Sequence, residues 1–301
     1  MGSLSVNAQG AIFMMVSMAA FMLNDTMMKL VSTEMSLFQA VFLRGLAATT
    51  LLAFLALRRR ALFLQVDAAD RRLIALRMFG DIGGTVCFLT ALFNMPIANA
   101  TAILQSMPLA VTLGAALFLG ETVGWRRYSA IVIGFVGVIV IVQPGSDGFT
   151  VYSLWAVGAV FFMVVRDLTT RRLTKGIPSI FVALTTGIGI TVVGGLVAAT
   201  QPWGAVSGHA LVLLAAAAVC LVVAYLFNVM AMRHGEIGFV SPFRYTVMIW
   251  AIVLGAVVFG DIPSAMMLAG TAIVMATGVF TFYRERLLAQ RAAGPQKFEP
   301  S

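Results

Sequence analysis

The feature that most constrains this chain is a repeated series of apolar segments long enough to cross a membrane. The stretch from Phe93 to Ile141 has a polar start, an apolar run, a break at Gly followed by an acidic residue, and a second apolar run. The stretch from Arg233 to Phe280 repeats that order. A constant offset of about 140 residues places Asp261 on Glu121. This pattern predicts two copies of one membrane unit.

Composition agrees with a membrane protein. Of 301 residues, 60% are hydrophobic and only 11% are charged, whereas soluble domains are roughly a quarter charged. A membrane-spanning helix needs about 20 mainly apolar residues. We therefore expect an all-α polytopic membrane protein with ten transmembrane helices, at residues 10–31, 36–57, 73–93, 98–119, 126–142, 150–170, 178–199, 208–231, 239–258 and 262–283.

The basic residues predict the orientation. If the N-terminus is cytoplasmic, nearly all of the 20 lysines and arginines lie in cytoplasmic segments. Lys29 is then alone on the opposite side, and Arg44 and Arg244 lie within spans. This asymmetry is typical of a multi-pass protein of the plasma membrane, here the bacterial inner membrane, with both termini cytoplasmic. The net charge of +8 then faces an anionic leaflet, and nucleic-acid binding is not expected.

Five spans in each half is an odd number, so the second half enters the membrane from the opposite side. The sequence therefore predicts two inverted five-helix repeats, a plan found in secondary transporters. The predicted organisation is a cytoplasmic N-terminus at 1–9, the first repeat at 10–142, a linker at 143–149, the second repeat at 150–283 and a cytoplasmic tail at 284–301.

Ionisable residues inside the spans are candidate site residues, because each costs at least about 2.5 kcal/mol at the centre of a membrane. Asp25 and Arg44 are expected at similar depth in neighbouring helices, with Asn24 beside them. They either form a site rim that contacts a charged substrate group or lock the helical hairpin as a structural ion pair. Asp81 lies four residues after Arg77, which predicts either an internal ion pair on one helix face or a substrate contact.

Two predicted spans at corresponding positions contain a proline, Pro108 and Pro242. Paired interruptions of this kind point to the binding site of a transporter. Arg244 alternatively extends its side chain to the cytoplasmic surface. The candidate substrate-binding residues near these prolines and in span 8 are Asn99, Thr101, Gln105, Tyr225, Asn228, Arg244, Tyr245 and Trp250.

The first copy of the repeat resembles a known family. Pro108, the LFLGE segment that ends at Glu121, Trp125 and the GFVGVIVI segment at 134–141 are similar to the EamA-like branch of the drug/metabolite transporter superfamily, and within it to YddG-type aromatic amino acid exporters. The resemblance covers about residues 10–285 and implies five plus five spans with cytoplasmic termini. The second copy departs from the pattern, with GDIPS at 260–264 and no Trp.

We therefore expect a secondary transporter that exports small metabolites, above all amino acids including aromatic ones, by alternating access through a central cavity. The alternatives are proton-coupled efflux of cationic drugs and, from another class, a membrane enzyme or structural partner protein. The chain contains no Walker A, His-Glu-x-x-His or Gly-x-Ser-x-Gly motif, so we expect no enzymatic activity, cofactor or metal. The expected partners are a small-molecule substrate and the lipid bilayer, and the expected state is a monomer or weak homo-oligomer.

Overall fold

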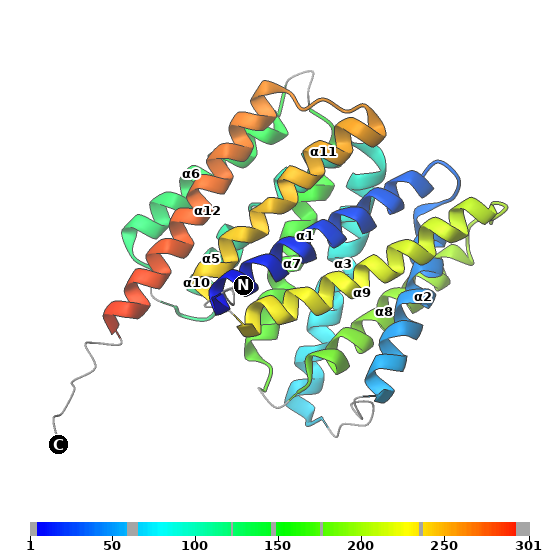
Figure 1. Cartoon of the computed structure of the whole chain (residues 1–301), viewed down its shortest axis with the longest axis horizontal. Coiled ribbons are helices and arrows are strands. Elements are labelled where there is room, and N and C mark those ends of the chain that lie inside the picture. Colours follow the sequence, from blue (N-terminus) through cyan, green and yellow to red (C-terminus); the bar gives the residue numbers. More distant parts are fainter. Residues whose placement is uncertain are drawn as a thin grey trace.

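The protein is described by a computed structural model over residues 5–58, 66–121, 123–145, 149–174, 177–234 and 237–292. Within these residues, ten helical segments are long and apolar enough to cross a membrane, and none of the residues is in a strand. Figure 1 shows the long helices side by side in one bundle. The predicted all-α polytopic membrane fold is confirmed. Residues 1–4, 146–148 and 293–301 of the predicted N-terminus, linker and tail lie outside the described residues.

Each half of the chain supplies five of these segments. The first half forms α1 (Val6–Val31), α2 (Leu37–Arg58), α3 (Ala68–Asn94), the consecutive helices α4 (Ile97–Leu104) and α5 (Met107–Phe118), and α6 (Trp125–Val142). The second half forms α7 (Val151–Arg172), α8 (Ser179–Ala198), α9 (Gly208–His234), the consecutive elements α10 (Ile237–Val240), η1 (Ser241–Thr246) and α11 (Val247–Phe259), and α12 (Ala265–Ala292).

Two helices extend furthest beyond the predicted apolar spans. The first turn of α3 precedes residue 73 and is capped by Asp67, whose side chain accepts a hydrogen bond from the Asp70 backbone N–H at 2.8 Å. The last helix, α12, continues past residue 283 to Ala292. Hydropathy detects only the part of a helix that lies in lipid, so polar turns beyond the membrane escape a prediction made from apolar runs.

The two proline-containing spans are interrupted. The fourth span bends at Gln105 and Ser106, between α4 and α5, and Pro108 lies in the first turn of α5. The ninth span passes through η1, a 3-10 helix that contains Pro242. Proline lacks a backbone N–H and its ring displaces the preceding turn, so both spans lose regular α-helical hydrogen bonding at matching places in the two halves.

The Gly-acid pairs end helices in the same way in both halves. Gly120 and Gly260 have φ values of 68° and 71°, in the left-handed region that favours glycine. The next backbone N–H then turns back, from Glu121 to the Ala115 carbonyl at 3.3 Å and from Asp261 to the Gly255 carbonyl at 2.9 Å. Local chemistry repeated in the sequence thus produces the same helix end twice.

The main helix packing joins the two halves of the chain. Helix α1 lies along α9 and α3 along α7, while α2 packs on α8 and α6 on α12 (Figure 1). The large buried cluster between these helices is rich in methionine and alanine, including Met14, Met22 and Ala159. The halves are therefore interleaved, and polar side chains from both of them meet inside the bundle.

Candidate functional site

Three polar side chains form a hydrogen-bonded series between α1 and α2. Arg44 of α2 donates from Nη1 to Asn24 Oδ1 at 3.2 Å, and Asn24 donates from Nδ2 to Asp25 Oδ1 at 2.9 Å. Arg44 and Asn24 are buried, and Asp25 is partly buried. Asn24 therefore bridges a cationic and an anionic group that stand side by side within the spans.

Tyr225 of α9 lies within electrostatic range of this series and of a second group of charges. Arg44 and Asp81 are both within electrostatic range of its hydroxyl, as are arginines of α3 and α7. Its ring meets Phe21 of α1 edge-on, with 5.5 Å between centroids. Tyr225 is nevertheless 37% exposed. Because four charged side chains act on the hydroxyl electrostatically, we infer that this exposed surface faces the interior of the bundle.

Asp81, in the middle of α3, binds two arginines. Its carboxylate oxygens lie 2.9 Å from Arg77 Nη1 and 3.2 Å from Arg166 Nη1. Arg166 of α7 also pairs with Asp167 at 2.8 Å, and Arg77 donates from Nε to Thr170 Oγ1 at 2.9 Å. The ion pair of the sequence prediction, Arg77 with Asp81, is thus part of a larger network that ties α3 of the first half to α7 of the second.

Arg166 is the main residue that the sequence analysis missed. It lies six residues before the end of α7, and the charge asymmetry predicts a cytoplasmic position for it. The long guanidinium side chain instead reaches Asp81 on the neighbouring helix. A charged pair at 166–167 directly after the apolar run FFMVV was the available signal.

The interrupted ninth span supplies further polar groups. Arg244 and Tyr245 lie on η1, and Asp167 and Arg166 are close enough to Arg244 to act on it electrostatically. Arg244 therefore belongs to the same charged region as the Asp81 network. Four arginines and three aspartates of this region are Arg44, Arg77, Arg166, Arg244, Asp25, Asp81 and Asp167.

Several predicted site residues carry buried polar atoms that lack a hydrogen-bond partner among the described residues. They come from α2, α4, the α4–α5 break, α9 and η1, and are Arg44 Nε, Thr101 Oγ1, Gln105 Nε2, Asn228 Oδ1 and Tyr245 Oη. A buried polar atom without a partner destabilises the folded protein by about 1–3 kcal/mol. Groups of this kind are suited to binding a polar solute or ordered water.

Two predicted residues lie differently. Trp250 is 41% exposed on a stripe of α11 with Val253 and Val257, which are 45% and 78% exposed. An apolar exposed stripe along one helix face is typical of a lipid-facing surface. Trp250 therefore does not belong to the candidate site. Asn99 is partly buried on α4, and its side chain takes no part in the hydrogen bonds described above.

Outside the spans, Glu34 connects the α1–α2 turn to the start of α9. Its carboxylate accepts a hydrogen bond from the Ser207 hydroxyl and lies 3.0 Å from His209 Nδ1. These two contacts, that of Ser207 first, hold the pKa of Glu34 below its ordinary value. Within the described residues, no cluster of three or more His, Cys, Asp and Glu side chains is placed to hold a metal ion.

Comparison with known proteins identifies the family. The model of the EamA-like transporter family matches the chain twice, at residues 8–143 and 150–283. The chain belongs to the EamA-like transporter family. It is therefore a multi-pass membrane protein of a transporter family, as the motifs in its first repeat suggested.

Characterised relatives within this family carry different solutes. The chain is 31% identical to a riboflavin transporter of Vibrio cholerae over 68% of this chain and 69% of the relative. It is 24% identical to an S-adenosylmethionine uptake transporter of Rickettsia felis over 92% and 93%. It is 26% identical to the pseudopaline exporter CntI of Pseudomonas aeruginosa over 88% and 93%.

A crystal structure also matches the EamA-like chain. The TM-score is 0.63 at 18% identity, over 95% of this chain and 99% of that one. At this identity the match establishes the fold alone. The resemblance to YddG-type exporters is not specifically supported, since the relatives described above transport riboflavin, S-adenosylmethionine and pseudopaline.

Proposed function

We propose that this EamA-like protein is a secondary transporter that exports small metabolites carrying an amino-acid group, including aromatic amino acids. The observation that carries the proposal is the Arg44–Asn24–Asp25 series. A zwitterionic amino acid has a carboxylate and an ammonium group attached to the same α-carbon. Arg44 provides a cationic fork for the carboxylate, and Asp25 provides an anion for the ammonium.

The surroundings of the series suit the rest of such a substrate. Arg44 Nε is a buried donor without a partner among the described residues, so it gains a hydrogen bond when a carboxylate arrives. Phe21 and Tyr225 form an edge-on aromatic pair nearby, and aromatic rings favour this arrangement with a further ring. The relative that takes up S-adenosylmethionine has a substrate with the same zwitterionic group.

The proposed mechanism is alternating access between two inverted repeats. Three features that match between the two halves support it. Helix α1 packs on α9 as α3 packs on α7, and proline interrupts both the fourth and the ninth span. The Thr49 hydroxyl also lies 3.1 Å from that of Thr191, the corresponding residue of the second half. The family model also matches once in each half. In this mechanism the Asp81–Arg166 pair closes one side and must separate when that side opens.

The proposal also covers the membrane location, the domain organisation and the oligomeric state of the protein. The protein lies in a bacterial inner membrane with both termini in the cytoplasm, since the arginine-rich connections lie on one side. The boundaries 1–9, 10–142, 143–149, 150–283 and 284–301 describe its organisation. The protein acts without enzymatic activity as a monomer or weak homo-oligomer.

The test is transport by the purified full-length protein in liposomes. Labelled phenylalanine is compared with 3-phenylpropionate, which lacks the ammonium group, and with phenethylamine, which lacks the carboxylate. Flux of phenylalanine down its concentration difference, at least tenfold above both analogues, is the expected result. Equal flux of all three compounds would overturn the proposed recognition of a zwitterion.

Two substitutions assign the two charges. Arg44→Gln is expected to lower phenylalanine flux at low substrate concentration about tenfold or more, because a hydrogen bond to a charged group contributes roughly 1.5–3 kcal/mol. It should leave phenethylamine flux unchanged. Asp25→Asn is expected to remove the preference for phenylalanine over 3-phenylpropionate. Arg126→Gln, at an exposed position outside the series, serves as the control for general charge effects.

A second candidate substrate is riboflavin, favoured by the relative of Vibrio cholerae with 31% identity. Riboflavin has no zwitterionic group, so its transport should depend on the aromatic pair and not on Arg44 or Asp25. Riboflavin flux that persists in Arg44→Gln but falls in Tyr225→Ala, without phenylalanine flux, would favour this candidate. Movement of a cationic dye only when a pH gradient is present would instead favour proton-coupled drug efflux.

A further inference from the structure

A lateral apolar groove lies apart from the charged interior. It is formed by α3, α5, α6 and α7 and has a volume of about 610 Å³, within the roughly 300–1,000 Å³ typical of ligand sites. Leucine, valine and phenylalanine dominate its lining. Phe118 and Phe161 are 71% and 64% exposed, so the groove opens on the surface of the bundle. In a membrane-spanning protein this surface faces lipid.

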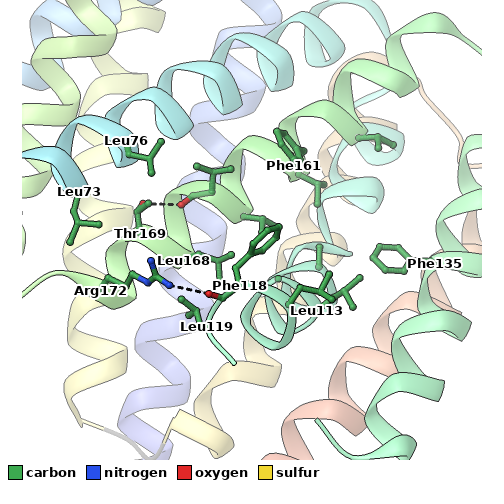
Figure 2. Close-up of a pocket in the computed structure, with 17 residues that line it drawn as sticks. Leu73, Leu76, Leu113, Phe118, Leu119, Phe135, Phe161, Leu168, Thr169 and Arg172 are labelled. Carbon is green, nitrogen blue, oxygen red and sulfur yellow. Dashed lines mark hydrogen bonds between the residues drawn. The ribbon is translucent and has the colours of Figure 1, made fainter. Parts of the chain in front are cut away.

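One end of the groove is cationic. Arg172, the last residue of α7, is among its lining residues. Figure 2 shows its guanidinium beside Phe118 and Leu119, where Nη2 donates to the Phe118 carbonyl at 3.0 Å. Within the described part of the chain this guanidinium forms no ion pair with a carboxylate, whereas the neighbouring Arg171 pairs with Glu121. Its other N–H groups are available to a phosphate.

The length of the groove fits a lipid chain anchored at that end. Its lining extends along α7 from Val157 to Arg172, which is about 22 Å at 1.5 Å per residue. One leaflet is half of a hydrocarbon core about 30 Å thick. The groove is therefore long enough for an acyl chain that extends through that leaflet. Arg71 and Arg72, at the same end of the bundle on α3, are exposed and add positive charge near the membrane surface.

We propose that this groove is a binding site for an anionic phospholipid, with one acyl chain between α5 and α7 and its phosphate on Arg172. The concave apolar wall selects an acyl chain, and the arginine selects a negative headgroup over a zwitterionic one. This site does not depend on which solute the protein transports, and its test does not measure transport.

The test is native mass spectrometry of the full-length protein in detergent, titrated with phosphatidylglycerol or phosphatidylcholine of identical chains. The wild type is expected to retain one phosphatidylglycerol at lower lipid concentration than phosphatidylcholine. Arg172→Gln should weaken phosphatidylglycerol binding about fivefold, the factor that corresponds to about 1 kcal/mol for one arginine near an anionic surface. Arg172→Glu should remove the preference entirely. Arg126→Gln, exposed on α6 outside the groove, should keep it.

A second pair of variants tests the apolar wall. Val157→Trp fills the groove and is expected to abolish retention of both lipids. Val136→Trp, at an exposed position of α6 outside the groove, should leave retention unchanged. Equal binding of the two lipids to the wild type, equal losses in Arg172→Gln and Arg126→Gln, or normal retention in Val157→Trp would each overturn the proposal, since non-specific surface lipid predicts those results.

Discussion

A charged side chain inside a membrane-spanning helix destabilises the protein unless another group pairs with it. Asp81 satisfies this condition through two arginines, one on its own helix and one on α7. Its side chain is 7% exposed, so little water can replace a lost partner. In contrast, the Arg171–Glu121 pair has side chains that are 45% and 43% exposed. The two ion pairs are therefore expected to contribute very differently to stability.

Asp81→Asn is expected to lower the free energy of unfolding by about 3 kcal/mol, because it leaves Arg77 without its carboxylate and Arg166 with Asp167 alone. Glu121→Gln should change it by less than about 1 kcal/mol, as is usual for exposed ion pairs. Thermal unfolding of both variants in the same detergent measures the difference. Equal midpoints for the two variants would show that the Asp81 network is not a buried electrostatic link.

Glu34, which lies outside the spans, makes the stability of the folded protein depend on pH. Ser207 and His209 depress its pKa in the folded protein, so this contact is fully stabilising above the ordinary glutamate value of about 4.3. The contribution is lost as pH falls from there through the depressed pKa. The expected outcome is a wild-type melting temperature above that of Glu34→Gln at pH 6, with the difference vanishing towards pH 3. A difference that grows on acidification would contradict the assignment.

At the scale of single helices, the close crossing of α3 and α7 depends on Gly80. A Cβ added there would lie 2.8 Å from both the Arg166 backbone nitrogen and the Phe162 carbonyl oxygen. Backbone atoms cannot move aside as a flexible side chain can. In contrast, a Cβ added to Gly158 of α7 would meet only Cys87 Sγ, at 3.7 Å. The two glycines thus form a matched pair for substitution.

Gly80→Ala is expected to destabilise the protein by about 1–3 kcal/mol through overpacking, and to separate Asp81 from Arg166. Gly158→Ala should be neutral or stabilising by up to about 1 kcal/mol, since alanine is the better helix former. Thermal unfolding in detergent measures both. The packing argument fails if Gly80→Ala unfolds at the wild-type temperature or Gly158→Ala is the more destabilised variant.

At the scale of the whole molecule, an even number of spans places both ends of the chain on the same side of the membrane. The described residues contain ten candidate spans, and the arginine distribution predicts that this side is the cytoplasm. The interleaved packing of the two halves means that this orientation applies to one body and not to two independent ones.

Reporter fusions test the orientation. A fluorescent protein joined after residue 301 is expected to fluoresce, and alkaline phosphatase at the same place to be inactive. Alkaline phosphatase joined after residue 145, in the predicted external linker, should be active. The opposite pair of activities would reverse the orientation and with it the predicted direction of export.

The sequence by itself determined the elements. Apolar length predicted the ten spans found in the described residues, because a bilayer requires about 20 apolar residues for each crossing. Pro108 and Pro242 marked both interrupted spans, and Gly120 and Gly260 marked two helix ends, because these residues act on their own backbone. The rarity of charges in lipid also selected Asp25, Arg44 and Asp81 as residues that require partners.

Only the tertiary structure decided which partners they have. Asn24 bridges Arg44 to Asp25, and Arg166 crosses from the other half of the chain to Asp81. The exposed position of Trp250 also depends on how α11 is turned. The Arg44–Asn24 and Asp81–Arg166 contacts join residues 20 and 85 positions apart in the chain. Hydropathy gives the length of a helix but neither its rotation nor its neighbours. They follow from packing between helices, which depends on small residues such as Gly80 at the contacts.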